Sequence, residues 1–167
     1  MNSIITRING LSVRFAAFVS AGFGLGYAPV ASGTFGALLG CGIVWTMTRA
    51  AFSLQQQIAI CVALSLVSIP VCTAGEKAFK KKDPGKVVAD EYLTFPICML
   101  GLYDQWMAHW WLMPVCFVVS RVADILKPFP AYRSQKLPSG LGITIDDVIA
   151  NLYALAVNWM IFSLAVK

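Results

Sequence analysis

Charged side chains are scarce in this sequence, and their scarcity excludes an ordinary soluble domain. Only 13% of the 167 residues are Asp, Glu, Lys or Arg, and 58% are hydrophobic, whereas a typical soluble domain carries about 25% charged residues. Charge-free stretches cover residues 15–48, 50–75, 92–103, 105–120 and 148–166. Several reach the roughly 17–25 residues that a helix needs to cross a bilayer. Their continuous apolar character favours helices over barrel strands, which would alternate in polarity.

Histidine is nearly absent and the cysteines form no sequence pairs, which excludes several kinds of catalytic site. The one histidine, His109, lies among Trp106, Trp110 and Trp111, a composition typical of the aromatic belt at a membrane surface. A Ser–His–Asp or Cys–His arrangement is therefore not expected. The five cysteines lie inside apolar stretches without a Cys-x-x-Cys pair, so we expect them to pack between helices and not to bind metal.

The sequence predicts a single all-α domain over residues 1–167, an integral membrane helical bundle of about four to five spans. The spans are expected near residues 36–52, 55–75, 90–103, 106–121 and 144–165. Residues 15–32 are also apolar, but three glycines and a proline interrupt them. We expect a re-entrant or interfacial segment there, and neither a clean span nor a removable signal peptide.

Basic residues decide between two topologies for residues 92–120, which could form one long kinked helix or two short helices with a turn near Asp104. With two helices, 11 of the 13 basic residues lie on one side, and only Arg49 and Lys167 lie on the other. Because basic residues collect on the cytoplasmic side of a membrane protein, we predict two helices and a cytoplasmic N-terminus. The same rule explains the net charge of +5 without nucleic acid as a partner, and it accounts for the lysines at 80–82.

Carboxylates gather beside the predicted spans on that same side. Asp90 and Glu91 open one span, Asp124 follows another, and Asp146 and Asp147 begin the last. Carboxylates at the mouth of a span are costly unless they are paired or coordinate a cation, and Mg²⁺ takes oxygen ligands from carboxylates, waters and phosphates. We therefore predict that these five residues hold Mg²⁺ and form the catalytic group. The alternative is that each carboxylate pairs with a neighbouring lysine or arginine.

Two basic residues beside these acids are candidates to bind phosphate. Arg121 and Lys127 flank Asp124 at a spacing that keeps all three on one side of a helix. An arginine binds a phosphate through two parallel hydrogen bonds, and a lysine binds it as a point charge. Anchoring at the membrane surface explains these two residues less well, because both are interleaved with Asp124.

A glycine-rich turn containing Gly33 and Thr34 has two interpretations. Backbone N–H groups at the start of a helix can cradle a phosphate, and Ser32 or Thr34 would then be the N-cap residue. The alternative is close packing of helices, because Gly36 and Gly40 have the Gly-x-x-x-Gly spacing. The sequence alone leaves both open.

Four blocks of the sequence, in order and across nearly the whole chain, resemble the bacterial phosphatidylglycerophosphatase A family. They are Gly22–Phe23–Gly24 with Pro29 and Gly33–Thr34–Phe35–Gly36, then Asp83–Pro84–Gly85 with Val87–Val88–Ala89–Asp90–Glu91, then Arg121, Asp124 and Lys127–Pro128–Phe129–Pro130, and last Gly140, Gly142, Asp146 and Asp147.

The resemblance implies that the chain removes the terminal phosphate from phosphatidylglycerophosphate and leaves phosphatidylglycerol, with Mg²⁺ as the cofactor. It also implies an anionic phospholipid as the partner and a site on the cytoplasmic side of the bacterial inner membrane. The matching positions are Thr34, Asp83, Asp90, Glu91, Arg121, Asp124, Lys127, Asp146 and Asp147, with Asp83 placed near the phosphate. The sequence departs from the family pattern where glycines are usual, at Thr94, Ser139 and Asn151, and where aromatics are usual, at Ser120 and Ala123.

Two other functions compete with a phosphatase. A membrane phosphotransferase of phospholipid synthesis also uses clustered aspartates, but its Asp-Gly-x-x-Ala-Arg pattern is absent from the sequence. A small transporter or channel subunit would favour acids near the middle of the bilayer, whereas most acids here lie at the ends of spans. The sequence leaves open the oligomeric state and whether water or an aspartate is the nucleophile.

Overall fold

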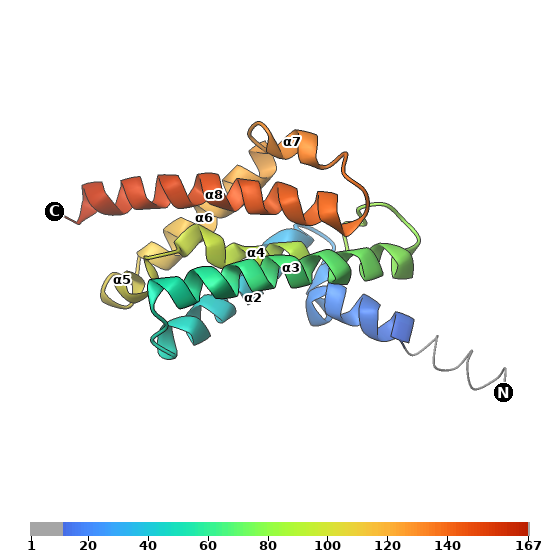
Figure 1. Ribbon diagram of the computed structural model, residues 1–167, viewed down its shortest axis with the longest axis horizontal. Helices are drawn as coiled ribbons and strands as arrows, with labels where there is room; N and C mark the ends of the chain where they lie inside the picture. The colour runs from blue at the N-terminus through green and yellow to red at the C-terminus, as the bar shows by residue number, and fades with distance from the viewer. Residues whose placement is uncertain (1–11, 167) are drawn as a thin grey trace.

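The computed structural model describes residues 12–166, most of which are helical (Figure 1). This part of the chain contains no strand, which confirms the prediction of an all-α protein. Residues 12–20 are helical, and the elements that follow are η1 Gly22–Tyr27, α2 Ser32–Arg49, α3 Leu54–Phe79, α4 Ala89–Thr94, η2 Phe95–Met99, α5 Tyr103–Ala108, α6 Leu112–Leu126, α7 Ala131–Ser134 and α8 Gly140–Ala165.

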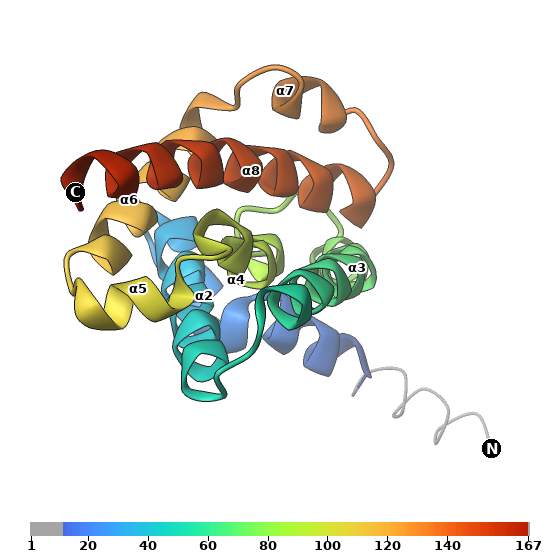
Figure 2. The same ribbon diagram turned by 60° about the vertical axis from the view of Figure 1, so that its left-hand side comes forward.

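A short buried segment lies at the centre of the bundle, and the longer helices surround it. The segment consists of α4 and the 3₁₀ turn η2, nearly all of whose residues are buried. It contacts α2, α3 and α8, and α6 packs along α8. Figure 2 shows α4 enclosed between α8, α2 and α3. The acidic start of α4 is therefore held inside the protein.

The prediction of one span over residues 90–103 is wrong. α4 ends at Thr94, and Pro96 lies at the start of η2, where its missing N–H and its ring prevent an α-helix from continuing. The 6 residues of α4 and the 5 of η2 rise less than about 20 Å, well short of the roughly 30 Å of a hydrocarbon core. The predicted span over 106–121 is likewise divided between α5 and α6, so residues 92–120 do not form one long helix.

Within residues 12–166, two helices are long and apolar enough to cross a membrane, which is fewer than the four to five predicted spans. They are α3 and α8, with 26 residues each, and each is about 39 Å long at roughly 1.5 Å per residue. α2 has 18 residues and α6 has 15, and both expose large apolar side chains such as Trp45 and Ile125. A broad apolar surface of this kind marks contact with a membrane or a partner.

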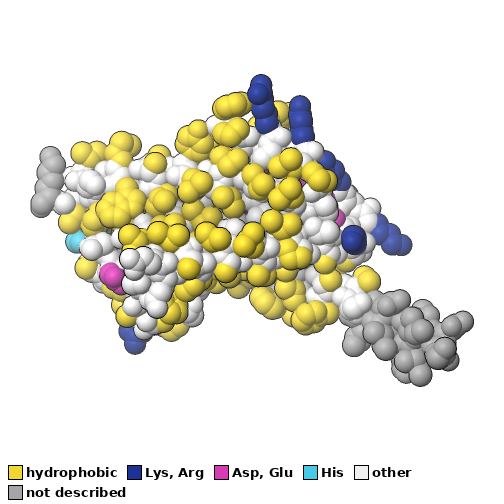
Figure 3. All heavy atoms as spheres, in the orientation of Figure 1, with side chains coloured by type: hydrophobic (Ala, Val, Ile, Leu, Met, Phe, Trp, Pro, Cys, Tyr) yellow, Lys and Arg dark blue, Asp and Glu magenta, His cyan; other side chains and the backbone are white. Residues whose placement is uncertain are grey.

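Charged and apolar side chains occupy different parts of the surface. Figure 3 shows apolar side chains along most of the molecule and basic side chains concentrated at the end where α3 ends and α8 begins. The connections from α3 to α4 and from α6 to α8 both lie at this end and carry most of the basic residues, whereas Arg49 ends α2 at the other. The predicted separation of charge is present in the described residues, while Arg7 and Lys167 lie outside them.

The glycine-rich segment near the N-terminus does not form a long helix. Helical residues 12–20 end before Gly22, whose φ is +55°, and the chain continues as the turn η1. Two hydrogen bonds attach the segment to the bundle, from Val88 N to Ser20 O and from Tyr92 Oη to Val19 O. A re-entrant or interfacial position for this segment stays a prediction.

Small residues on α2 let the central segment approach closely. A Cβ atom at Gly40 would lie 2.4 Å from Phe95 Cβ, and one at Gly36 would lie 2.7 Å from Val88 Cβ. The Gly-x-x-x-Gly spacing of this helix therefore serves close packing against α4 and η2, as one of the two interpretations predicted.

We expect Gly40→Ala to destabilise the protein by about 1–3 kcal/mol, because the added methyl group meets the Phe95 side chain in a filled core. Gly42→Ala is the matched control, since nothing lies within 4 Å of a Cβ atom at Gly42. Thermal unfolding in detergent measures both variants. Equal melting temperatures would contradict this account of how α2 packs.

Candidate active site

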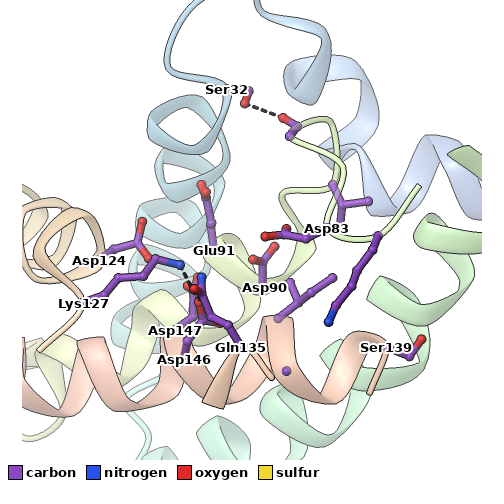
Figure 4. A pocket seen from close by; sticks show the side chains of 15 residues that line it. Ser32, Asp83, Asp90, Glu91, Asp124, Lys127, Gln135, Ser139, Asp146 and Asp147 are labelled. Atoms are coloured by element: carbon purple, nitrogen blue, oxygen red, sulfur yellow. Dashed lines mark hydrogen bonds and ion pairs between the residues drawn. The ribbon is translucent and has the colours of Figure 1, made fainter. Parts of the chain in front are cut away.

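A cavity of about 190 Å³ opens at the basic end of the bundle. Side chains from the start of α2, the connection before α4, α4 itself, the end of α6, the connection after α7 and the start of α8 surround it (Figure 4). The polar lining residues are Ser32, Lys82, Asp83, Asp90, Glu91, Asp124, Lys127, Gln135, Ser139, Asp146 and Asp147. Segments far apart in the sequence thus contribute to one acidic cavity with two lysines.

The first turn of α4 contributes two adjacent carboxylates. Asp90 is buried, and its pKa is raised well above the ordinary value by burial and then by the charges of Glu91, Asp146, Asp124 and Asp83. Burial also raises the pKa of Glu91 to about 7, although the Arg121 guanidinium acts in the opposite direction. Without a further cation, burial therefore favours the protonated form of Asp90, and Glu91 is about half protonated near pH 7.

A glycine on α2 makes room for the Glu91 carboxylate. A Cβ atom at Gly33 would lie 1.9 Å from Glu91 Oε1, so every residue with a side chain would displace this carboxylate. α2 begins at Ser32, and its N-cap residue is Ala31 with φ +53°. Neither Ser32 nor Thr34 is therefore the N-cap residue that the phosphate-cradle interpretation named, and the Ser32 hydroxyl instead donates to Gly85 O at 2.6 Å.

The end of α6 contributes an arginine that holds two acids. Arg121 Nη2 donates to Asp124 Oδ2 at 2.9 Å, and Arg121 Nη1 lies 3.5 Å from Glu91 Oε2. Arg121 does not line the cavity itself. The guanidinium therefore fixes one carboxylate on each of two helices and partly offsets their repulsion.

Lys127 ends α6 and reaches across to α8. It adopts a left-handed conformation with φ +45° at the C-cap position, and its ammonium group donates to Asp146 Oδ2. Gln135 Nε2 donates to the same oxygen at 2.9 Å. Asp146 and its buried neighbour Asp147 stand near the start of α8, so this contact joins the two helices at the cavity.

Some carboxylate oxygens at the cavity have no partner in the described part of the chain. Asp90 Oδ1 and Asp146 Oδ1 are buried and accept no hydrogen bond from residues 12–166, although buried polar atoms normally have a partner. No group of three or more acidic, histidine or cysteine side chains in these residues is arranged to hold a metal. Mg²⁺ is usually held by one or two carboxylates, waters and phosphate oxygens, and this partial arrangement suits that mode better than an all-protein cage.

The structure brings together most of the predicted site residues. Asp83, Asp90, Glu91, Asp124, Lys127, Asp146 and Asp147 all line the cavity. The remaining three predicted residues, Gly33, Thr34 and Arg121, do not line the cavity. Gly33 and Arg121 contact carboxylates of the cavity, and Thr34 follows Gly33 in the first turn of α2.

Four of the polar lining residues were not predicted as site residues. Lys82 belongs to the lysine run that the sequence explained by membrane orientation, while Ser32, Gln135 and Ser139 carry no charge that would single them out. Ser139 Oγ donates to Glu76 Oε2 at 2.8 Å, and the Asp83 backbone N–H donates to Glu76 Oε1 at 2.9 Å. Glu76 thereby joins the two connections that border the cavity.

The chain is similar to proteins described as lipid phosphatases. The model of the family described as Phosphatidylglycerophosphatase A matches residues 18–162. A protein of Bacteroides thetaiotaomicron, provisionally named phosphatidylinositol-3-phosphatase, is 31% identical over 142 residues, 81% of this chain and 86% of that protein. A protein of Escherichia coli named Phosphatidylglycerophosphatase A is 28% identical over 86% of this chain and 81% of its own length. A protein of Haemophilus influenzae with the same name is 31% identical over 86% of this chain and 86% of its own length. No solved structure matches the chain.

Three departures from the family pattern form one hydrogen-bonded network next to the cavity. Ser120 Oγ donates to Asn151 Oδ1 at 2.6 Å, and Asn151 Nδ2 donates to Thr94 Oγ1 at 3.0 Å. Thr94 Oγ1 in turn donates to Asp90 O at 2.7 Å. All three side chains are buried. The network connects α6, α8 and α4 one turn from the Asp90 carboxylate.

We expect Asn151→Ala to lower the free energy of unfolding by about 1–3 kcal/mol, because Ser120 and Thr94 each lose a buried partner. Leu152→Ala is the control, since the Leu152 side chain is 49% exposed and its loss should change stability by less than about 1 kcal/mol. Denaturant unfolding of both variants in the same detergent measures the difference. Similar stabilities would mean that the network does not hold these helices together.

Proposed function

Because the chain belongs to the phosphatidylglycerophosphatase A family and is a phosphatase, we propose that it converts phosphatidylglycerophosphate to phosphatidylglycerol and phosphate. The observation that carries the proposal is the cavity, where five carboxylates from three helices face Lys127 and Lys82. A terminal phosphate needs positive charge around its oxygens, and the lysines together with a cation held by the acids would provide it.

In this proposal the protein crosses the bacterial inner membrane several times, and the cavity opens to the cytoplasm. The length and apolar character of α3 and α8 support the first point. The concentration of basic residues at the end that holds the cavity supports the second, because such residues favour the cytoplasmic side. The cavity would then lie level with the lipid head groups, where a phosphorylated lipid can enter it.

Mg²⁺ is the proposed cofactor, held by oxygens of Asp90, Glu91, Asp124, Asp146 and Asp147. The two buried oxygens without a partner, Asp90 Oδ1 and Asp146 Oδ1, support a cation at this place. A bound Mg²⁺ would lower the energy of the negative charge on the phosphoryl oxygens during hydrolysis.

The protein's own groups would orient the phosphate and exchange protons. Lys127 and Lys82 would bind phosphoryl oxygens, and Arg121 would keep Glu91 and Asp124 in place through its ion pairs. Hydrolysis joins the oxygen of water to phosphorus and breaks the bond from phosphorus to the glycerol oxygen. The water loses a proton and the glycerol oxygen gains one. A carboxylate of the cavity that is not bound to the cation would take up the proton from water.

A second substrate follows from the name of one relative. The Bacteroides protein is provisionally named for activity on an inositol lipid, and phosphatidylinositol 3-phosphate also presents a phosphate monoester on a lipid head group. Purified protein should be assayed for phosphate release from both lipids and from lysophosphatidate, with Mg²⁺ and with EDTA. We expect the fastest release from phosphatidylglycerophosphate, dependent on Mg²⁺, and a preference for the inositol lipid would replace that assignment.

Asp90→Asn and Asp147→Asn should each lower phosphatase activity by about 10²-fold or more, because each change removes a carboxylate that would hold the cation, with little change in volume. Asp104→Asn, at the exposed start of α5 on the opposite end of the bundle, should keep full activity. Phosphate release and circular dichroism of the three variants test this. A correctly folded Asp90→Asn or Asp147→Asn protein with full activity would contradict the assignment of that residue to the active site.

The raised pKa of Glu91 predicts how the stability of the metal-free protein depends on pH. A carboxyl group whose pKa rises from 4.5 to about 7 on folding contributes stability below pH 4.5 and loses that contribution as the pH rises through 7. In EDTA, Glu91→Gln should therefore raise the melting temperature relative to wild type more at pH 8 than at pH 6. An equal difference at both pH values would show that Glu91 does not titrate in this range.

A further inference from the structure

An apolar groove follows the contact between α6 and α8 on the outside of the bundle. It has a volume of about 300 Å³, and its lining includes Val118, Val122 and Leu126 of α6 together with Tyr153 and Val157 of α8. Val118, Val122 and Leu126 are 58%, 48% and 72% exposed. Its walls are apolar throughout, so the groove suits a hydrocarbon and offers nothing to a polar ligand.

One end of the groove coincides with the edge of the carboxylate cavity. The groove is lined by Leu126 and Pro128, the residues on either side of Lys127, whose ammonium group binds Asp146 at the cavity. Tyr153 is two helical turns beyond Asp146, on the same side of α8. Its hydroxyl donates to Phe129 O at 2.8 Å and ties α8 to the turn that follows Lys127.

From these observations we propose that the groove receives one acyl chain of the phosphorylated lipid whose head group occupies the cavity. This inference rests on the proposed function. Val118 and Leu126 are eight residues apart, so the groove runs at least about 12 Å along α6, and a chain that lies in it starts beside Lys127. A single phospholipid can therefore fill both sites, with its phosphate at the lysines and its chain between α6 and α8.

The groove would position the substrate more than it would increase its affinity. An acyl chain in a bilayer is already surrounded by hydrocarbon, so its transfer to apolar side chains brings little hydrophobic gain. A chain held between α6 and α8 instead fixes where the head group sits relative to the carboxylates. Such positioning affects the reacting geometry directly.

A second apolar groove on the other side of α8 provides a control. It lies between α3 and α8 and is lined by Ile58, Val62 and Leu66, among others. On α8 this groove begins at Val148, directly after Asp147 of the cavity. On α3 it ends at Leu66, ten residues and about 15 Å before Glu76 at the end of the helix that borders the cavity, so this wall does not lead to the cavity. Val62 is 54% exposed, which makes Val62→Trp a close match to Val118→Trp.

The test compares long-chain and short-chain substrates in mixed micelles. The ratio of kcat/KM for dipalmitoyl to dihexanoyl phosphatidylglycerophosphate should fall at least fivefold in Val118→Trp and stay within twofold of wild type in Val62→Trp. An unchanged ratio in Val118→Trp would overturn the inference, and so would an equal fall in both variants. If wild type hydrolyses only phosphatidylinositol 3-phosphate, the proposed substrate fails, and the same ratio measured on that lipid still tests the groove.

A binding measurement without turnover gives an independent answer. Phosphatidic acid with a diazirine on one acyl chain should label peptides of α6 and α8 in wild type, and Val118→Trp should reduce that label while Val62→Trp leaves it. Equal labelling along both grooves, or label unaffected by Val118→Trp, would show that the chain has no fixed place.

Discussion

Repulsion among buried carboxylates is the constraint on which the rest of this structure depends. Six acids line one cavity of about 190 Å³ at the end of an apolar bundle, and five of them lie on helices. Burying charges of one sign together is costly unless opposite charge offsets it. Two basic residues provide part of that positive charge. Arg121 forms ion pairs with Glu91 and Asp124, and Lys127 forms one with Asp146. In the described part of the chain, Asp90 and Asp147 have no basic partner. Their negative charge must therefore be removed by protonation or offset by a bound cation.

Close packing around α4 keeps these carboxylates near one another. The first turn of α4 carries two acids into the centre of the protein because α2 presents glycine where α4 approaches, at Gly33 beside Glu91 and at Gly40 beside Phe95. Thr94, Asn151 and Ser120 then fix α4 to α8 and α6 by hydrogen bonds. A glycine at position 94 or 151 would have no side chain to form these hydrogen bonds, so the network depends on the residues that this chain carries there.

Much of the site could be predicted from the sequence, because a charged residue next to an apolar span is energetically costly unless it is paired or binds a ligand. The carboxylates and Lys127 stood out for that reason, and all of them line the cavity. Lys82, Gln135 and Ser139 could not be predicted, because their places depend on how two connections fold over the cavity. The prediction of a span over 90–103 was wrong because these residues are apolar for burial inside the bundle and not for contact with lipid, and Pro96 divides them. Hydropathy alone does not distinguish a helix buried by protein from one that faces lipid.

Hydrolysis as proposed depends most directly on a divalent cation among the carboxylates. Mn²⁺, which shares the oxygen preference of Mg²⁺, can be titrated into purified, metal-free protein and followed by electron paramagnetic resonance. We predict bound Mn²⁺ that Mg²⁺ displaces, with binding lost in Asp147→Asn and kept in Asp104→Asn. If wild type binds no Mn²⁺ with phosphate present, or if Asp147→Asn binds it as tightly as wild type, then the carboxylates do not form a cation site.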